Sequence, residues 1–295
     1  MNETTPYETT FFELRDVTLH TVSAGPESGE LVVLLHGFPE YWYSWRHQIP
    51  VLAAKGYRVV AVDLRGFNLS SKPKGLKAYR SETVAEDISQ LVTALGRTNA
   101  HIVGHDWGAA IAWLFAMRHQ EQLKSLTILN LPHPLKMMEG FRDWKQIKKS
   151  WYIAFFQLPF VPERFLKYNN HWVLKWLMNN DPVQPDVFSE HDVQNFIDAF
   201  EIHDAWSSTI AYYRALRFEK LWNIEHRMSV IQAPTLILWG TQDRFLDHRF
   251  AAPDPSWVPN FELHLNEEAS HWLQQDQPDW VNNHLCGFLA SIHDG

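Results

Sequence analysis

The stretch of the sequence with the clearest chemical potential is GHDWG at 104–108, which places the carboxylate of Asp106 between two glycines. An apolar run precedes it and a helix-like stretch follows it, so the pattern predicts a sharp strand-to-helix turn that presents Asp106 above a sheet. Glycines fit the flanking positions because larger side chains would collide with neighbouring backbone. The positive end of the helix dipole favours the ionised carboxylate. Asp106 is therefore a candidate nucleophile, and the alternative is that it only caps the helix.

A carboxylate nucleophile forms an ester with an sp³ carbon that bears a leaving group, and water must then hydrolyse that ester. The second step needs a base, and His271 lies in a loop just after the last predicted strand. Asp243 follows the preceding strand and is the expected acid that orients the imidazole and stabilises its charged form. The order nucleophile, acid, base is typical of enzymes with this kind of turn. Asp247 is the rival acid, but Asp243 lies closer to the strand end.

A second glycine-containing segment, HGFPE at 36–40, also follows an apolar run. Its backbone can offer the amide of Phe38 beside the amide of Trp107, and the two together would form an oxyanion hole. The hole would act when water attacks the ester and a tetrahedral intermediate forms. The alternative is that the segment only ends a strand. Asp63 and Arg65, which follow another apolar run, are expected to be a structural pair that fastens their loop.

Short apolar runs alternate with helix-like stretches along most of the chain. The runs are rich in leucine and β-branched residues and are bounded by glycine or polar residues, which is typical of strands buried on both faces of a parallel sheet. A hairpin is predicted before them from two alternating segments. The runs begin at residues 31, 58, 101, 126, 235 and 261.

This alternation stops after residue 134 and resumes only near residue 235. The intervening segment is helical in pattern and rich in aromatic residues, with breaks that contain proline. We therefore predict an α/β fold with a mostly parallel central sheet, helices on both faces, and an inserted helical cap. The predicted core comprises residues 1–134 and 226–295, and the predicted cap comprises residues 135–225.

The composition restricts the class of protein. The 295 residues include 45% hydrophobic and 20% charged residues, enough for a large buried core. The net charge is −8 and there is no long run of Lys or Arg, so neither nucleic acid nor an anionic membrane surface is an expected partner. A single cysteine, Cys286, leaves no disulfide framework and favours a reducing compartment. No segment is apolar and long enough to insert into a membrane, and we expect a cytoplasmic protein.

Taken together, these motifs resemble those of the α/β-hydrolase-fold epoxide hydrolases over nearly the whole chain. The core motifs are HGFPEYWYSWRHQIP, DLRGFNLSSKP, GHDWGAA, NLPHP and EASHWLQQDQP, and the cap motifs are SWYIAFFQLP and AYYRAL. In that family two cap tyrosines hold and protonate the epoxide oxygen, and the matching segments imply Tyr152 and Tyr213 for this role. Tyr212 adjoins Tyr213, so either hydroxyl could face the cavity. Three further tyrosines are expected to be core residues: Tyr7, Tyr41 and Tyr168.

The resemblance implies an epoxide hydrolase that converts a small-molecule epoxide to a vicinal diol through a covalent ester on Asp106, with no metal and no organic cofactor. One alternative is a haloalkane or haloacid dehalogenase with the same nucleophile. Trp107 suits the haloalkane type, but Phe38 stands where such enzymes typically hold halide with a donor such as Asn, and the fluoroacetate type has Arg after the nucleophile. Another is a non-catalytic ligand-binding protein, which the complete triad disfavours. The epoxide, its enantiomer, the attacked carbon and the oligomeric state stay open.

Overall fold

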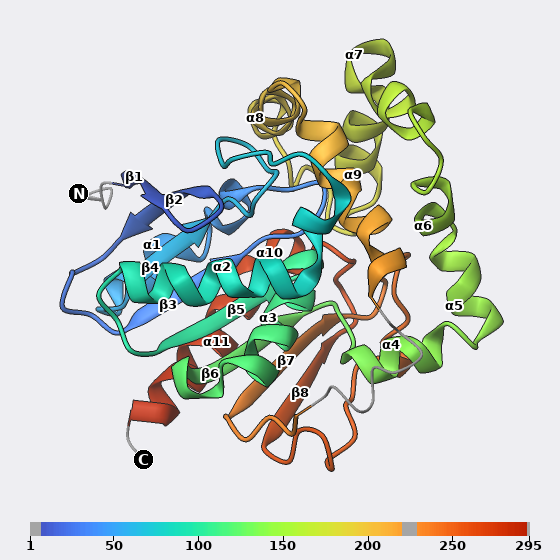
Figure 1. The fold of residues 1–295 in the computed structure, drawn as a ribbon. Coiled ribbons are helices and arrows are strands. Elements are labelled where there is room, and N and C mark those ends of the chain that lie inside the picture. The colour runs from blue at the N-terminus through green and yellow to red at the C-terminus, as the bar shows by residue number, and fades with distance from the viewer. Residues whose placement is uncertain (1–6, 220–228, 294–295) are drawn as a thin grey trace.

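The computed structural model describes residues 7–219 and 229–293, and an eight-stranded sheet forms its centre (Figure 1). The strand order is β1-β2-β4-β3-β5-β6-β7-β8. The first two strands form an antiparallel hairpin and β2 runs antiparallel to β4, whereas every other neighbouring pair is parallel. The strands are β1 (Glu8–Glu13), β2 (Thr18–Ala24), β3 (Leu31–Leu35), β4 (Arg58–Val62), β5 (Ala100–His105), β6 (Leu123–Leu129), β7 (Thr235–Gly240) and β8 (Phe261–Asn266).

The central strands send alternate side chains to opposite faces of the sheet, as a period of two requires. On β3, Val33 and Leu35 join one core cluster with the apolar side chains of α2 (Ser81–Ala94) and α3 (Trp107–Arg118). Val32 and Leu34 join a second cluster with α1 (Ile49–Ala54) and α11 (Pro278–His293). Helices therefore cover both faces of the sheet, which confirms the predicted fold class and explains why these strands read as continuous apolar runs.

Between β6 and β7 the residues that the structure describes form helices and no strand. Figure 1 shows most of these helices along the upper and right edge of the molecule, set apart from α1, α2, α3 and α11. They are α4 (Pro134–Gly140), α5 (Trp144–Lys149), α6 (Trp151–Phe155), α7 (Val161–Asn180), α8 (Glu190–Glu201) and α9 (Ala205–Ala215). The exact bounds of cap and core stay a prediction, and residues 220–225 of the predicted cap lie outside the described residues. None of the helices in the described ranges is long and apolar enough to cross a membrane.

The helical segment packs over the carboxyl ends of the parallel strands. Phe38, in the loop after β3, makes edge-on ring contacts at 5.4 to 6.2 Å with four cap rings: Phe156, Phe200, Trp206 and Tyr213. Parallel strands bring the loops at their carboxyl ends to one edge of the sheet. The loops that follow β5, β7 and β8 carry Asp106, Asp243 and His271, the last just ahead of the short helix α10 (Leu273–Asp276). The topology therefore gathers the candidate residues beneath the cap.

Candidate active site

Asp106 sits at a strained turn between β5 and α3. Its φ of 49° lies in the left-handed region, which a residue with a side chain seldom adopts. The flanking glycines are required by space: a Cβ on Gly108 would lie 2.0 Å from the carbonyl oxygen of Leu35, and one on Gly104 would lie 2.5 Å from the carbonyl oxygen of Gly108. Asp106 occupies the N-cap position of α3, yet its side chain makes no capping hydrogen bond. The carboxylate is thus free of the capping role and points into the site.

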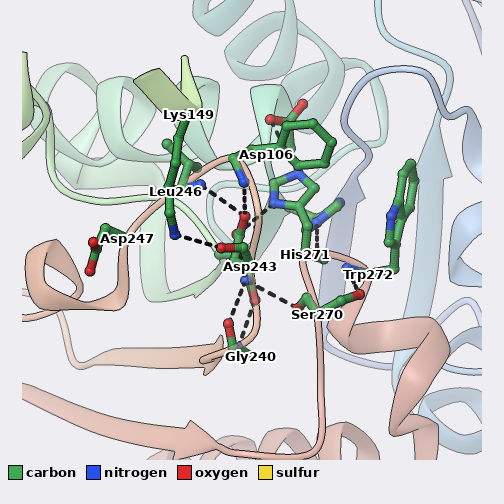
Figure 2. A network of polar contacts seen from close by, with 12 residues as sticks. Asp106, Lys149, Gly240, Asp243, Leu246, Asp247, Ser270, His271 and Trp272 are labelled. Atoms are coloured by element: carbon green, nitrogen blue, oxygen red, sulfur yellow. Dashed lines mark hydrogen bonds and ion pairs between the residues drawn. The ribbon is translucent and has the colours of Figure 1, made fainter. Parts of the chain in front are cut away.

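His271 lies between two carboxylates, one at each ring nitrogen (Figure 2). Its Nδ1 is 2.7 Å from Oδ2 of Asp243, and its Nε2 is 3.5 Å from Oδ2 of Asp106. Burial alone would lower the pKa of His271, but the charges of Asp243 and Asp106 outweigh that effect and raise the pKa well above its ordinary value. The two carboxylates therefore favour the protonated, cationic form of the imidazole.

Asp243 is fixed by donors on both of its oxygens. Oδ1 accepts the amides of Phe245 at 2.7 Å and Leu246 at 2.8 Å, whereas Oδ2 accepts from His271 and from Asn130 Nδ2 at 2.8 Å. Burial would raise the pKa of Asp243, but the adjacent imidazolium and these hydrogen bonds lower it. The carboxylate stays ionised and cannot rotate away from the imidazole without losing several partners.

Asp247, the rival acid, takes no part in this network. Its carboxylate accepts from the guanidinium of Arg249 at 3.0 and 3.1 Å, and Figure 2 shows it apart from the His271 ring. Asp243 is the acid that contacts His271 because it lies three residues after the end of β7, close to the edge of the sheet where the site forms. Lys149 of α5 adds a contact from the cap, since its ammonium donates to the main-chain oxygen of Asp243 at 2.7 Å.

Asn130, which follows β6, belongs to the site although the sequence reasoning did not select it. Its φ of 47° is left-handed, its amide nitrogen donates to Asp243, and its side-chain oxygen accepts the Gly240 amide at 3.0 Å. It therefore ties the end of β7 to the acid. The available signal was its position: it is the first residue after an apolar run, in the NLPHP motif, where loop residues reach the sheet edge.

The backbone amide of Phe38 donates to Oδ1 of Asp106 at 2.8 Å. The other predicted donor, the amide of Trp107, belongs to the first residue of α3, directly after Asp106. Gly37 permits the approach, because a Cβ there would lie 2.7 Å from Oδ1 of Asp106. One carboxylate oxygen is thus held by backbone, while the other faces His271.

Glu40 and His105 form a buried pair beneath the site that the sequence reasoning also missed. His105 Nδ1 is 2.7 Å from the Glu40 carboxylate, and His105 Nε2 is 2.8 Å from the main-chain oxygen of His271. Burial would raise the pKa of Glu40, but the imidazole of His105 outweighs it and lowers that pKa to about 2. The pair anchors the loop that carries His271. The sequence gives no separate signal for it, because both residues flank stronger motifs.

Asp63 and Arg65 do not pair with each other, contrary to expectation. Asp63 contacts the imidazole of His20 at 2.5 Å, and Arg65 forms a two-pronged ion pair with Asp87 of α2 at 2.5 Å. All of these side chains are buried. The prediction of a single pair was wrong because each of the two residues meets a different neighbouring element, and that choice depends on tertiary packing.

Tyr152 and Tyr213 lie together in the cavity above Asp106, with ring centroids 5.9 Å apart. Burial, with the nearby charge of Asp106 next in size, raises the pKa of both hydroxyls well above their ordinary value. Tyr212 points elsewhere: its hydroxyl donates to the main-chain oxygen of Arg65 at 2.8 Å. The structure thus places Tyr213, and not Tyr212, against the cavity.

Two cavities share this centre. Asp106, Tyr152 and Tyr213 line both of them. The large chamber, of about 570 Å³, is walled by aromatic residues that include Phe38, Phe155, Phe165, Trp176, Trp206 and Phe245. The small chamber, of about 180 Å³, is walled by apolar residues that include Ala110, Leu114, Leu131, Met137, Phe141 and Leu216. The site suits an apolar molecule whose reacting group sits between two substituents.

Comparison with known proteins identifies the fold and the family. A family model described as the alpha/beta hydrolase fold matches residues 30–278. The human protein epoxide hydrolase 4 is 39% identical over 92% of this chain and 75% of its own length. The AB hydrolase superfamily protein YfhM of Bacillus subtilis (strain 168) is also 39% identical, over 95% of this chain and 97% of its own.

Solved structures agree as well. The crystal structure of an epoxide hydrolase of Bacillus megaterium in complex with an inhibitor has a TM-score of 0.87 and 34% sequence identity, with 95% of this chain and 100% of that chain covered. An epoxide hydrolase A from Mycobacterium thermoresistibile has a TM-score of 0.85 and 28% identity, with 97% of this chain and 98% of that chain covered. These relatives, together with the strained turn at Asp106 and the two acids around His271, show that the chain belongs to the α/β-hydrolase-fold epoxide hydrolase family and is a hydrolase enzyme.

Proposed function

We propose that this enzyme opens an epoxide to a vicinal diol through a covalent ester on Asp106. The observation that carries the proposal is the meeting of three groups in one cavity: a carboxylate from the core and two phenols, Tyr152 and Tyr213, from the cap. A nucleophile on one side and proton donors on the other match the two ends of a strained C–O bond.

In the first step, one oxygen of Asp106 attacks an epoxide carbon and the C–O bond opens. Oδ2 is the reacting oxygen, because Oδ1 is held by the Phe38 amide. The departing oxygen is a strongly basic alkoxide and needs a proton or close donors. Because the pKa values of Tyr152 and Tyr213 are raised, both phenols stay protonated at neutral pH and can donate to that oxygen.

In the second step, water attacks Cγ of the ester and His271 accepts a proton from it. The tetrahedral intermediate then collapses, the bond between Cγ and Oδ2 breaks, and the diol leaves with Oδ2 and the proton that His271 returns. Ester formation removes the charge of Asp106, one of the two charges that raise the pKa of His271. That pKa then falls, so the ring can lose its proton and serve as a base, while Asp243 keeps it oriented. The alkylation step itself thus converts His271 from a cation that holds the nucleophile into a base for hydrolysis.

The backbone amides of Phe38 and Trp107 act in this second step. When water adds to Cγ, negative charge grows on Oδ1, and the Phe38 amide already donates to that atom at 2.8 Å. A donor aimed in advance at the atom that gains charge lowers the barrier without reorganisation. We assign the Trp107 amide as the second donor, because it follows the nucleophile directly at the start of α3.

The substrate is an apolar epoxide, since the walls of both chambers are mainly aliphatic and aromatic. No residue is assigned to a metal or an organic cofactor. The expected cytoplasmic location stays a prediction.

A single turnover in H₂¹⁸O tests the mechanism. Water that attacks Cγ leaves ¹⁸O in the Asp106 carboxylate, which mass spectrometry of the peptide detects, whereas direct attack on the epoxide places the label in the diol on the first turnover. Asp106→Ala should lower kcat by about 10⁴ or more, as the loss of a nucleophile does. Asp247→Asn is the matched control, since that carboxylate lies outside the network.

The same enzyme preparation tests the two alternatives. Release of chloride or bromide from haloalkanes at a rate far above epoxide opening would establish a dehalogenase. Absence of turnover on styrene-oxide-like, aliphatic and fatty-acid epoxides, with ligand binding retained, would establish a non-catalytic protein.

A further inference from the structure

The outward side of α5, α6 and α7 exposes many apolar side chains. Of the sixteen large hydrophobic side chains that are exposed in the described part of the chain, ten lie between residues 144 and 176. Single exposed hydrophobic residues are ordinary, but a concentration of them marks a binding surface. We call this surface the cap face, and its residues are Trp144, Ile147, Trp151, Leu158, Phe160, Val161, Phe165, Tyr168, Trp172 and Trp176.

The cap face is also basic. Residues 141–180 contain seven Lys and Arg against two Asp and Glu, a formal charge of +5 within a chain of −8. Both acids are occupied, Asp143 by Arg249 and Glu163 by Arg214. None of the seven basic side chains forms an ion pair with a residue in the described ranges. Lys149 donates to a main-chain oxygen and Lys148 lies over the ring of Trp144, and the other five are Arg142, Lys145, Arg164, Lys167 and Lys175. Their charge is therefore available to a partner.

Two of the aromatic rings stand at turns that hold them outward. Phe160 is 73% exposed with a left-handed φ of 61°, which is rare for a bulky residue. Tyr168 is 71% exposed at a break within α7, where its own φ is negative and the three residues that follow it have positive φ. The prediction that Tyr7, Tyr41 and Tyr168 are core residues is therefore correct only for Tyr41, because Tyr7 is 43% exposed and Tyr168 is 71% exposed. The two cap turns present their rings to the surroundings.

The cap face is continuous with the mouth of the large chamber. Trp151, Phe165 and Trp176 are exposed on this face and also line the chamber. Lys148 and Arg244 stand beside them in the same lining, and the Arg244 side chain is 59% exposed. Figure 1 shows α5, α6 and α7 following one another along one side of the molecule, away from both termini. The chamber thus opens on the aromatic and basic surface.

We propose that the cap face docks on an anionic phospholipid bilayer, with the mouth of the large chamber toward the lipid. Indole and phenol rings favour the headgroup region, where an apolar body meets a polar edge. Lys and Arg are attracted by lipid phosphates, and each contributes to binding near the surface. A symmetric dimer through this face would set two basic surfaces against each other. The net charge of −8 predicts no membrane partner, but it averages over a molecule whose charge is unevenly placed.

Vesicle co-sedimentation without substrate tests the proposal independently of catalysis. We expect the wild-type protein to bind vesicles of phosphatidylcholine with 30% phosphatidylglycerol in 50 mM NaCl, and to bind weakly in 500 mM NaCl or to phosphatidylcholine alone. The variant Lys145→Glu/Lys167→Glu/Phe160→Asn reverses two charges and removes one ring, and none of the three residues lines the chamber. Its partition coefficient should fall at least 30-fold, since each basic residue near an anionic surface contributes about 5-fold.

The matched control is Arg15→Glu/Lys55→Glu/Phe11→Asn, which makes the same kinds of change at exposed residues near β1 and α1. It lowers the net charge by the same amount, so it should keep wild-type binding within about 2-fold if position decides. Thermal melting and hydrolysis of a dissolved epoxide establish that both variants fold. Equal loss in both variants, no binding by the wild type at low salt, or a wild-type dimer in light scattering that only the cap-face variant abolishes would overturn the proposal.

Discussion

The neighbouring residues Tyr212 and Tyr213 offer a stringent test of the proposed chemistry, because one hydroxyl faces the cavity and the other faces the core. Replacing each by Phe removes one oxygen atom and keeps the ring. Tyr213→Phe should slow ester formation, because the opening oxygen loses a donor. Tyr212→Phe should leave that rate unchanged, because its hydroxyl donates to the main-chain oxygen of Arg65 at 2.8 Å.

The magnitudes follow from the two hydrogen bonds. A hydrogen bond to a charged oxygen contributes about 1.5–3 kcal/mol, which corresponds to a rate about 10- to 150-fold lower for Tyr213→Phe. Tyr152→Phe should lie in the same range, and the double variant should lose about 10²- to 10⁴-fold, the usual contribution of general acid catalysis. Tyr212→Phe should instead lower the free energy of unfolding by about 1–3 kcal/mol, because a buried carbonyl loses its partner.

Stopped-flow tryptophan fluorescence with an aryl epoxide measures ester formation directly, since the ring of Trp107 lies 5.1 Å from that of Tyr213. Urea denaturation measures stability on the same preparations. The reasoning would be refuted by a Tyr213→Phe variant that alkylates at the wild-type rate. It would be equally refuted if Tyr212→Phe slowed alkylation while its stability stayed unchanged.

Three further predictions concern the residues around the nucleophile. His271→Gln should still form the ester but release it slowly, so its intact mass should rise by one substrate; an unmodified mass with bound substrate would exclude the hydrolytic role. Asn130→Ala should slow ester hydrolysis about 10-fold and destabilise the fold by about 1–3 kcal/mol, because Asp243 loses a donor. Decay of the trapped ester and urea denaturation measure both, and an unchanged decay rate would contradict the orienting role. Because the pKa of Glu40 is lowered from 4.5 to about 2, the stability it contributes is complete above pH 4.5 and is lost as the pH falls toward 2. The melting temperature of Glu40→Gln should therefore fall less than that of the wild type between pH 5 and pH 3, and parallel curves would argue against the assignment.

Much of the fold can be predicted from the sequence because buried parallel strands appear as short continuous apolar runs. The apolar runs that begin at residues 31, 58, 101, 126 and 235 became buried strands, since a segment buried on both faces needs apolar residues at nearly every position. The run at 261 became β8, an edge strand whose side chains are half-buried or exposed, so it is not buried on both faces as the pattern predicts. The turn that carries Asp106 can also be predicted in part. Glycine at 108 is required by the neighbouring strand β3, because a Cβ there would meet the carbonyl oxygen of Leu35. The requirement at 104 is local, because a Cβ there would meet the backbone of Gly108. Local constraints of this kind do not depend on distant parts of the chain.

The features of the site that could not be predicted from the sequence depend on contacts between elements far apart in the chain. Arg65 meets Asp87 across the packing of a loop on α2, and no spacing rule selects that partner over Asp63. The direction of Tyr213 depends on the rotation of α9 over the core, which a pair of adjacent tyrosines does not reveal. Asn130 carries chemistry that depends on strands meeting side by side, so its role emerges only when β6 and β7 are paired.

In the proposed mechanism, the difference in size between the two chambers has a consequence for which epoxide carbon reacts. Oδ2 of Asp106 occupies a fixed point between them, so a disubstituted epoxide can be seated in two opposite senses that differ in which carbon meets the nucleophile. A bulky substituent fits only the chamber of about 570 Å³, and the chamber of about 180 Å³ then takes the smaller one. The size of the two substituents thus determines the binding orientation, and the orientation determines which carbon Asp106 attacks. Narrowing the large chamber or widening the small one would invert the preferred sense, and with it the configuration of the diol, while leaving the nucleophile, base and acid untouched.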